Sequence, residues 1–309
     1  MLADALSDIL RSVHLSGGVY FRCEFTAPWG MEVLANPDAE FHVVVRGQCW
    51  LARPGEKEPI PLQAGDVVVF LDGSRHRLLD TPRGKALSPE KIIGNQSLAN
   101  FGPVAYGGGG TPVTILCGYF RFNRDSAHPL LAALPNFMHV PGAQFGEADA
   151  IIGLMQRETK HAAPGTEAVV DRLSEVLFIQ ILRAHIQQSD NANGMLAALR
   201  DRKVCAALGC MHQYPERPWT LESLATELGM SRSAFTARFT ALVRQTPMQY
   251  LSAWRIEQAR LMLRETRLST AAIVEKVGYG SEAAFGKAFK RRVGVGPGVY
   301  RRRAGQASA

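Results

Sequence analysis

The side chains best suited to metal chemistry in the N-terminal half are one carboxylate and two imidazoles. Glu40 and His42 have the same parity on one expected strand, so both can face the interior of a sheet protein. His76 can join them from another strand, and one carboxylate with two imidazoles can bind a divalent metal ion. The alternative is a hydrogen-bonded pair of interior histidines without a metal. The residue types alone leave both interpretations open.

Sulfur chemistry is a second possibility in this half, because it contains Cys23 and Cys117. The other cysteines are Cys49, Cys205 and Cys210, and the five show neither a CxxC motif nor Cys/His zinc spacing. Their odd number also argues against a disulfide framework. Arg22 adjoins Cys23, and a nearby cation lowers the pKa of a thiol. Buried, unreactive thiols are the alternative interpretation for every cysteine.

In the C-terminal third, the candidate functional residues lie in a repeated pattern. Residues 224–239 and 273–289 share an apolar pair four residues apart, a Gly, a Ser and two Phe four residues apart. Leu224, Leu228 and Gly229 align with Ile273, Val277 and Gly278 at an offset of 49, and Ser231, Phe235 and Phe239 align with Ser281, Phe285 and Phe289 at an offset of 50, with Gly280 as the extra residue.

Each shared position has a physical reason. The apolar pair lies on one face of a first helix, and the Gly adopts the left-handed conformation that ends that helix. The Ser caps a second helix, which the two Phe anchor to the core. The pattern therefore predicts a helix-turn-helix unit, twice. The helix expected between the units, over 248–265, spans roughly 27 Å and can hold two recognition helices about one DNA turn (~34 Å) apart.

Charge is distributed unevenly along the chain. Residues 196–309 contain 19 Lys/Arg against 8 Asp/Glu, whereas the remainder holds 16 basic and 20 acidic residues. A locally basic region is typical of a nucleic-acid-binding domain, because Lys and Arg neutralise phosphates. Together with the duplicated helix pair, it predicts binding to double-stranded DNA. A protein-interaction module built from the same helix pairs is the alternative.

The elements around these residues indicate two domains. Residues 19–122 contain short apolar runs separated by turn sequences, which predict the strands of a sandwich or small barrel. Residues 148–160 and 167–188 have helical spacing, and the second helix is apolar enough to be buried in its own domain or against a partner. We expect an α+β protein with a sensor and dimerisation domain over 1–190, a linker over 191–198 and an all-α domain over 199–309.

The C-terminal pattern resembles the AraC/XylS family of transcriptional regulators over residues 199–303. The resemblance is carried by 218–225 (PWTLESLA), 230–235 (MSRSAF), 246–251 (TPMQYL) and 294–301 (GVGPGVYR). In that family the second helix of each unit enters the major groove. The base-facing positions implied by the resemblance are Arg232, Ser233, Thr236 and Ala237 in the first unit and Glu282, Ala283 and Lys287 in the second. The residues expected to contact phosphates, which position the protein without reading sequence, are Arg238, Lys290, Arg291 and Arg292.

The N-terminal domain resembles a degenerate cupin β-barrel with flanking helices. Residues 65–80 resemble the second cupin motif, in which His76 matches the histidine, but Leu71 replaces the Pro and Asp80 replaces the Asn. Glu40 matches the end of the first cupin motif, whose two histidines are absent. An active cupin dioxygenase needs the full ligand set, so the incomplete motif disfavours an enzyme.

Segments 2–18, 27–30, 116–118 and 130–135 resemble a cupin-sensor subgroup of AraC regulators that includes regulators responding to reactive chlorine. Cys23 and Cys117 fall where cysteines occur in those oxidant-responsive relatives. The resemblance implies that the two form an oxidant-responsive pair, in which a sulfenic acid is captured as a disulfide.

We expect a cytoplasmic transcriptional activator, not an enzyme, whose sensor domain controls the DNA-binding domain. Its expected partners are promoter DNA, RNA polymerase, a second copy bound through residues 148–188, and a small-molecule or oxidant effector. No cofactor is expected, with a divalent metal in the barrel as the one exception that the residues allow. We expect no signal peptide, because the first residues include Asp4 and Asp8 and no basic region, and no transmembrane helix, because the apolar stretches are too short. A metal-dependent cupin enzyme fused to a DNA-binding domain is the alternative.

Overall fold

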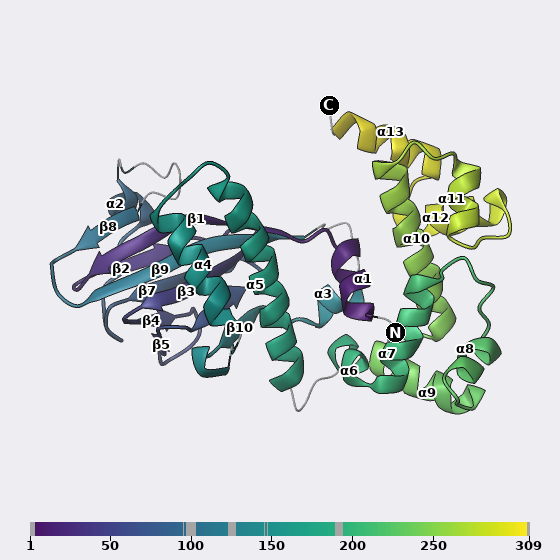
Figure 1. The fold of residues 1–309 in the computed structure, drawn as a ribbon, viewed down its shortest axis with the longest axis horizontal. Coiled ribbons are helices and arrows are strands. Elements are labelled where there is room, and N and C mark those ends of the chain that lie inside the picture. The colour runs from purple at the N-terminus through teal and green to yellow at the C-terminus, as the bar shows by residue number, and fades with distance from the viewer. Residues whose placement is uncertain are drawn as a thin grey trace. The chain divides into compact units, whose positions relative to one another are not determined.

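The computed structural model describes residues 4–94, 96, 103–122, 128–144, 146, 148–188 and 194–307. The chain forms two compact units (Figure 1). The barrel unit comprises Leu15–Asn123 and Leu134–Asp190, and the helical unit comprises Met1–His14, Arg124–Ala133 and Asn191–Ala309. The expected α+β architecture, with a β-rich N-terminal part and an all-α C-terminal part, is confirmed.

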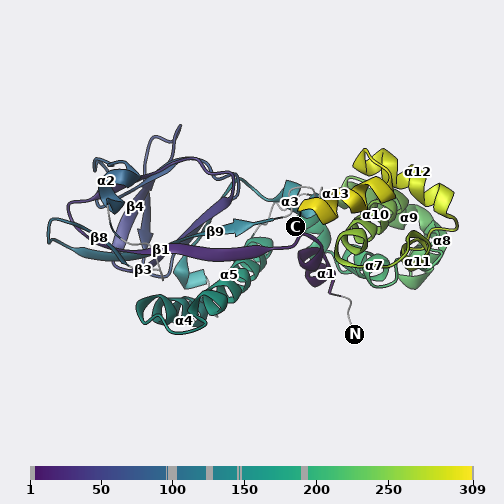
Figure 2. The ribbon, with the colours of Figure 1, turned by 90° about the horizontal axis from the view of Figure 1, so that it is seen from above.

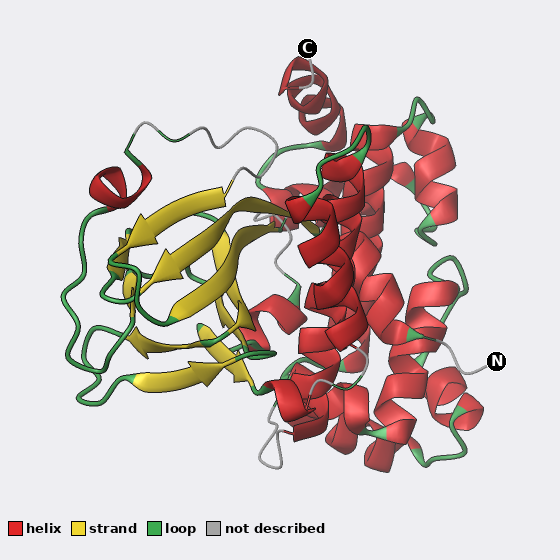
Figure 3. Ribbon diagram, turned by 60° about the vertical axis from the view of Figure 1, so that its left-hand side comes forward, coloured by secondary structure: helices red, strands yellow, loops and turns green. Residues whose placement is uncertain are grey.

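Two sheets form the barrel unit (Figure 2, Figure 3). The strand order is β10-β6-β3-β9-β1-β8 in the six-stranded sheet and β2-β7-β4-β5 in the other. Among the described strands, β1 and β8 pair in parallel and the other neighbours pair antiparallel. The strands are β1 (Ser16–Thr26), β2 (Gly30–Val33), β3 (Ala39–Arg46), β4 (Gln48–Ala52), β5 (Ile60–Gln63), β6 (Val67–Phe70), β7 (His76–Leu79), β8 (Pro103–Gly107), β9 (Pro112–Arg121) and β10 (Phe137–Val140).

Apolar side chains of both sheets share one core. Val68 and Ile115 of the six-stranded sheet and Leu51 and Leu78 of the four-stranded sheet are all fully buried in it. Their burial explains the short apolar runs in the sequence, because two sheets that pack face to face bury the inner face of every strand.

Two helices lie on the outer side of the six-stranded sheet (Figure 2). Phe178 of α5 packs against Phe120 of β9, with ring centroids 4.9 Å apart. The apolar band of this helix is buried on one face and exposed on another. Leu177 is fully buried, whereas Val169 and Val176 are 42% and 40% exposed. The helical elements of the unit are α2 (Pro89–Ile93), the 3-10 helix η2 (Gly142–Gln144), α4 (Ala148–Lys160) and α5 (Thr166–Gln188).

The two predicted helix-turn-helix pairs are α8–α9 and α11–α12, and both contact the long helix α10 or its neighbours. Ser231 and Ser281 cap α9 and α12 by accepting a hydrogen bond from the backbone N–H three residues later. Gly229 and Gly278 have φ of 60° and 75°, a region that favours glycine. The helices of the unit are α1 (Ala5–Ser12), α3 (Pro129–Ala133), α6 (Met195–Arg200), α7 (Arg202–Gln213), α8 (Leu221–Glu227), α9 (Arg232–Val243), α10 (Pro247–Glu265), α11 (Thr270–Lys276), α12 (Glu282–Val293) and α13 (Pro297–Ala307).

The limits of the units differ from the continuous domain expected over 1–190. Helix α1 packs on α7 and α10, and α3 packs on α6, so both belong to the helical unit. The expected linker 191–198 overlaps α6, because the apolar side chains of Met195 and Leu196 are buried; residues 191–193 lie outside the described part. Among the described helices, none combines the length and apolarity needed to cross a bilayer.

Candidate nucleic-acid interface and sensor site

The first helix of interest is α9, whose exposed side carries every residue predicted for the first unit. Two of these side chains have ion-pair partners: Arg232 pairs with Glu222 at 2.7 Å, and Arg238 donates to Asp201 at 2.7 Å. Surface ion pairs contribute only about 0–1 kcal/mol, so exchanging them for phosphate contacts costs little. The predicted residues are Arg232, Ser233, Ala237 and Arg238, which are exposed, and Thr236, which is half-buried.

Helix α12 carries the stronger positive charge of the two. Lys287, Lys290 and Arg291 are exposed, and the described residues provide no ion-pair partner for any of them. Glu282 and Ala283 are exposed in the first turn, where the Ser281 cap begins the helix. Helix α12 therefore presents these three cations and the Glu282 carboxylate to solvent.

A groove of about 760 Å³ lies between α10 and α12. Arg291 and Arg292 of α12 line it together with Gln245 and Ser252, which belong to the start of α10 or precede it. The sequence pattern did not single out Gln245 or Ser252, because only the packing of α10 against α12 places them beside the two arginines.

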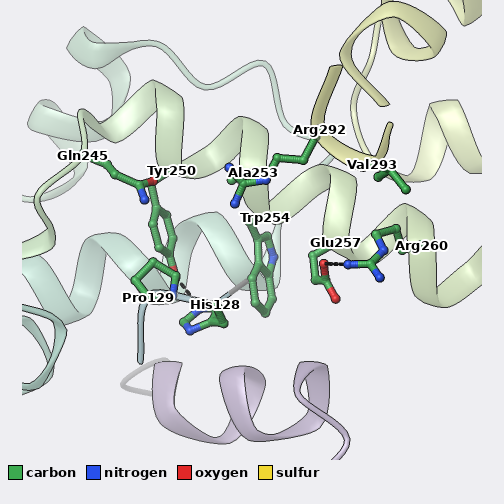
Figure 4. A pocket seen from close by; sticks show the side chains of 10 residues that line it. All are labelled: His128, Pro129, Gln245, Tyr250, Ala253, Trp254, Glu257, Arg260, Arg292 and Val293. Atoms are coloured by element: carbon green, nitrogen blue, oxygen red, sulfur yellow. Dashed lines mark hydrogen bonds and ion pairs between the residues drawn. The ribbon is translucent and has the colours of Figure 1, made fainter. Parts of the chain in front are cut away.

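A buried polar cluster joins three parts of the helical unit, and Figure 4 shows two of its members, His128 and Tyr250. The Tyr250 hydroxyl of α10 lies 2.7 Å from His212 Nε2 and 3.2 Å from His128 Nε2. The Leu130 N–H donates to His128 Nδ1, so the neutral His128 ring carries its proton on Nε2 and donates it to Tyr250. The Tyr250 hydroxyl in turn donates to His212 Nε2.

The same cluster reaches helix α1. His212 stacks on Trp254 with ring centroids 3.8 Å apart, and its Nδ1 lies 3.9 Å from the Asp8 carboxylate. Burial lowers the pKa of His212 and lowers that of His128 to about 3, so both imidazoles are neutral at pH 7. Through these contacts the cluster connects α1 and the segment before α3 to α7 and α10. No sequence pattern had indicated it.

In the barrel unit, the structure brings the predicted cysteine pair together. Cys23 of β1 and Cys117 of β9 are diagonal neighbours on adjacent antiparallel strands, and their Sγ atoms are 3.8 Å apart. Both are at most 2% exposed. Contact with Cys23 and burial raise the pKa of the Cys117 thiol well above its usual range, so Cys117 is a protonated thiol at neutral pH.

The structure gives the Arg22 side chain a partner other than Cys23. Successive side chains point to opposite faces of a strand, so Arg22 projects away from the face that carries the two thiols. Its guanidinium instead forms an ion pair with Glu24.

A chain of hydrogen bonds starts at Cys117 and ends at a backbone carbonyl. His76 Nδ1 donates to the Ser74 carbonyl at 2.9 Å, and burial lowers the pKa of His76 to about 4, so its neutral ring accepts at Nε2. His42 Nε2 lies 2.7 Å away and donates to it. His42 Nδ1 then accepts from the Cys117 thiol at 3.2 Å, since burial also keeps this imidazole neutral.

The predicted metal ligands also lie close together. Glu40, His42 and His76 each offer one ligand atom within 4.8 Å of the others. However, two nitrogens at 2.0–2.1 Å from a tetrahedral metal are about 3.3 Å apart, whereas the two Nε2 atoms are 2.7 Å apart. This arrangement is a hydrogen-bonded histidine pair and does not fit a tetrahedral metal. The predicted divalent metal stays a prediction.

Both parts of this chain match known protein families. Residues 4–187 match the Cupin family, and residues 224–303 match the Helix-turn-helix domain family. A putative AraC-like transcription regulator of Streptomyces lividans is 33% identical to this chain, over 97% of it and 98% of the relative. The chain belongs to the family of AraC-like transcriptional regulators.

Two further relatives of this AraC-like regulator have specific names. The HTH-type transcriptional regulator AlkR of Acinetobacter baylyi is 32% identical over 96% of this chain and 99% of its own. RclR of Escherichia coli, an RCS-specific HTH-type transcriptional activator, is 28% identical over 98% and 99%. The predicted family is therefore confirmed, and the protein is a DNA-binding transcriptional regulator with an N-terminal cupin domain.

The buried histidines predict an acid-sensitive helical unit. A histidine in the unfolded chain titrates near pH 6.5 and the folded His128 near 3, so below about 6.5 only the unfolded state binds this proton. The contribution of His128 to stability is complete above pH 6.5 and falls by about 1 kcal/mol per pH unit on acidification. His128→Asn keeps an acceptor for the Leu130 N–H but cannot titrate.

Between pH 6.5 and 4.5 the unfolding free energy of the wild type falls with pH. We expect the slope of this fall to be smaller in His128→Asn than in the wild type by about 1 kcal/mol per pH unit. Urea denaturation at several pH values measures this slope. The exposed His161 provides the control, because His161→Asn should keep the wild-type slope. A wild-type slope in His128→Asn would contradict the assignment of a buried neutral imidazole.

Proposed function

We propose that this regulator is a dimeric transcriptional activator that reads its operator with α9 and α12 and responds to an oxidant or small-molecule effector through the barrel unit. It acts in the cytoplasm, where its promoter DNA lies, and its partner in activation is RNA polymerase. The name of its relative RclR, an RCS-specific activator, supports both the direction of control and the kind of effector.

The single observation that carries DNA reading is the exposed face of α9 and α12, each held from behind by two buried Phe. On α12, Lys287 can donate to guanine and Glu282 can accept from cytosine. On α9, Ser233 can contact several bases and Ala237 can contact a thymine methyl group. The phosphate contacts proposed above then set the position of these helices without reading sequence.

Two substitutions on α12 separate base reading from phosphate binding. Lys287→Ala should relax specificity at one base position and cost about 1–3 kcal/mol on the matched operator. Arg291→Ala should weaken binding to all sequences alike and reduce the slope of log affinity against log salt by about 1. Fluorescence anisotropy with operator variants at several salt concentrations measures both effects.

The control is Lys57→Ala, which removes an exposed lysine from a turn of the barrel unit and should change neither quantity. Equal losses on matched and mismatched operators would place Lys287 on a phosphate. A wild-type protein whose affinity for its own promoter region does not depend on salt would refute DNA reading altogether.

Oxidant sensing is favoured by the position of the two thiols. Their Sγ atoms need to move only from 3.8 Å to a bonded distance of about 2.05 Å, and the strands that carry them are direct neighbours. Two thiols form a disulfide by losing two electrons and two protons, and hypochlorous acid takes up the electrons to give chloride and water. A disulfide would cross-link β1 to β9.

We expect Cys23→Ser and Cys117→Ser each to abolish induction of the target promoter by hypochlorous acid, because either change removes one half of the disulfide. Cys205→Ser, which alters a half-buried cysteine of α7, should keep the response. Mass spectrometry of the treated wild-type protein should show a Cys23–Cys117 linkage. Normal induction in both barrel variants would rule the pair out.

Dimerisation is proposed through the exposed apolar stripe of α5. Val169, Leu173 and Val176 are spaced four and three residues apart, which places them along one side of the helix. Val169 and Val176 stay 42% and 40% exposed in the single chain, an unfavourable state for side chains that size. A second copy that packs the same stripe would bury them symmetrically.

Val176→Glu should convert the dimer to a monomer, because it places a charge in the apolar contact. Ala168→Glu adds the same charge at an exposed α5 position beside the stripe and should leave the dimer intact. Light scattering at micromolar concentration gives the mass of each variant. A monomeric wild type, with and without operator DNA, is the result that excludes this dimer.

A further inference from the structure

The barrel unit contains a cavity of about 290 Å³ with a mostly apolar wall and a polar end. Most of its wall is apolar and comes from β1, β2, the residues after β2, and α2. Leu34, which is 51% exposed, belongs to this wall. The main apolar residues of the wall are Phe21, Met31, Val33, Leu34 and Ile93.

One buried carboxyl group forms the polar end of this cavity. Glu40 is only 6% exposed, and its Oε1 accepts a hydrogen bond from Asn36 Nδ2 at 3.0 Å. Its Oε2 has no hydrogen-bond partner among the described residues. His42 and Cys117 also line the cavity, but they are hydrogen-bonded to each other. Glu40 Oε2 is therefore the acceptor that a ligand in this cavity would meet.

The charge around Glu40 favours a cationic ligand. No Lys or Arg is among the described residues that line the cavity. The neighbouring carboxylates already have partners outside it, because Asp38 binds Arg121 at 2.7 Å and Glu32 binds Arg75. An anionic ligand would meet further negative charge here, whereas an ammonium group would supply the missing counter-charge.

We propose that this cavity binds a small amphiphilic amine, with its ammonium group donating to Glu40 Oε2 and its apolar tail lying against Phe21, Met31 and Ile93. This assigns a chemical class to the small-molecule effector and rests on the proposed function only for its effect on transcription. The volume lies near the lower end of the ~300–1,000 Å³ typical of ligand pockets, which suits an alkyl tail of moderate length.

Three eight-carbon probes test the proposal directly on the full-length protein. Octylamine, octan-1-ol and octanoate share one tail and differ in the charge of the head group. Isothermal titration calorimetry at pH 7 should show octylamine binding at least about tenfold more tightly than either of the others, because a charge-assisted hydrogen bond contributes more than a neutral one.

Glu40→Gln keeps the size of the side chain and an acceptor for Asn36 but removes the charge. It should abolish the preference for octylamine over octan-1-ol and leave the affinity for octan-1-ol within about twofold. Glu56→Gln, which changes an exposed carboxylate in the turn between β4 and β5, should bind like the wild type. Thermal unfolding of each variant verifies that the barrel is folded.

Three results would overturn the proposal. They are equal affinity for octylamine and octan-1-ol, tighter binding of octanoate, and an unchanged preference for octylamine in Glu40→Gln. Operator binding measured without any probe is a separate readout. Its loss would refute the DNA-reading function while leaving the amine site intact, so the two failures are distinguishable.

Discussion

The Tyr250 hydroxyl is buried, and its two hydrogen bonds hold together parts of the helical unit that are far apart in the sequence. A hydroxyl left unpaired in this position would cost about 1–3 kcal/mol. His128 and His212 satisfy it, and they do so only because burial keeps both rings neutral. The helices that carry the residues proposed to read DNA therefore depend on segments that come before and within the barrel sequence.

The barrel unit is covalently connected to these segments of the helical unit at two places. Helix α1 ends at Ser12 and β1 begins at Ser16, while β9 ends at Arg121 and α3 begins at Pro129. Strands β1 and β9 pair with each other, and α1 packs on α7 and α10, which both contact α9. The chain therefore continues from these two strands into segments of the helical unit. The proposed sensor needs two arrangements of this element that differ in DNA affinity.

The helix-turn-helix units could be predicted closely because their determinants are local. A Ser cap, a glycine of positive φ and two Phe four residues apart act within about fifteen residues, and the structure places Ser231, Ser281 and Gly229 as expected. The docking of α1 and residues 128–133 could not be predicted. It depends on contacts between residues more than 100 positions apart, such as His128 with Tyr250.

The barrel site shows the same division between local and long-range information. Strand parity correctly placed Glu40 and His42 on one face, and the motif placed His76 near them. Parity also places Arg22 and Cys23 on opposite faces of β1. The nitrogen atom of His42 and of His76 that carries the proton could not be predicted from the sequence. It follows from the hydrogen bond to the Ser74 carbonyl and from the 2.7 Å contact between the two rings.

Those proton positions tell how oxidation would change the free energy of the barrel. The Cys117 thiol is the donor to His42 Nδ1, and His42 is 3% exposed. A disulfide has no S–H, so it would leave His42 Nδ1 buried without a donor, at a cost of about 1–3 kcal/mol. Each 1.4 kcal/mol is a factor of ten in a two-state equilibrium. The loss of this one hydrogen bond would therefore favour, by about 5- to 150-fold, a second arrangement of the barrel that gives His42 a new donor or exposes it to water.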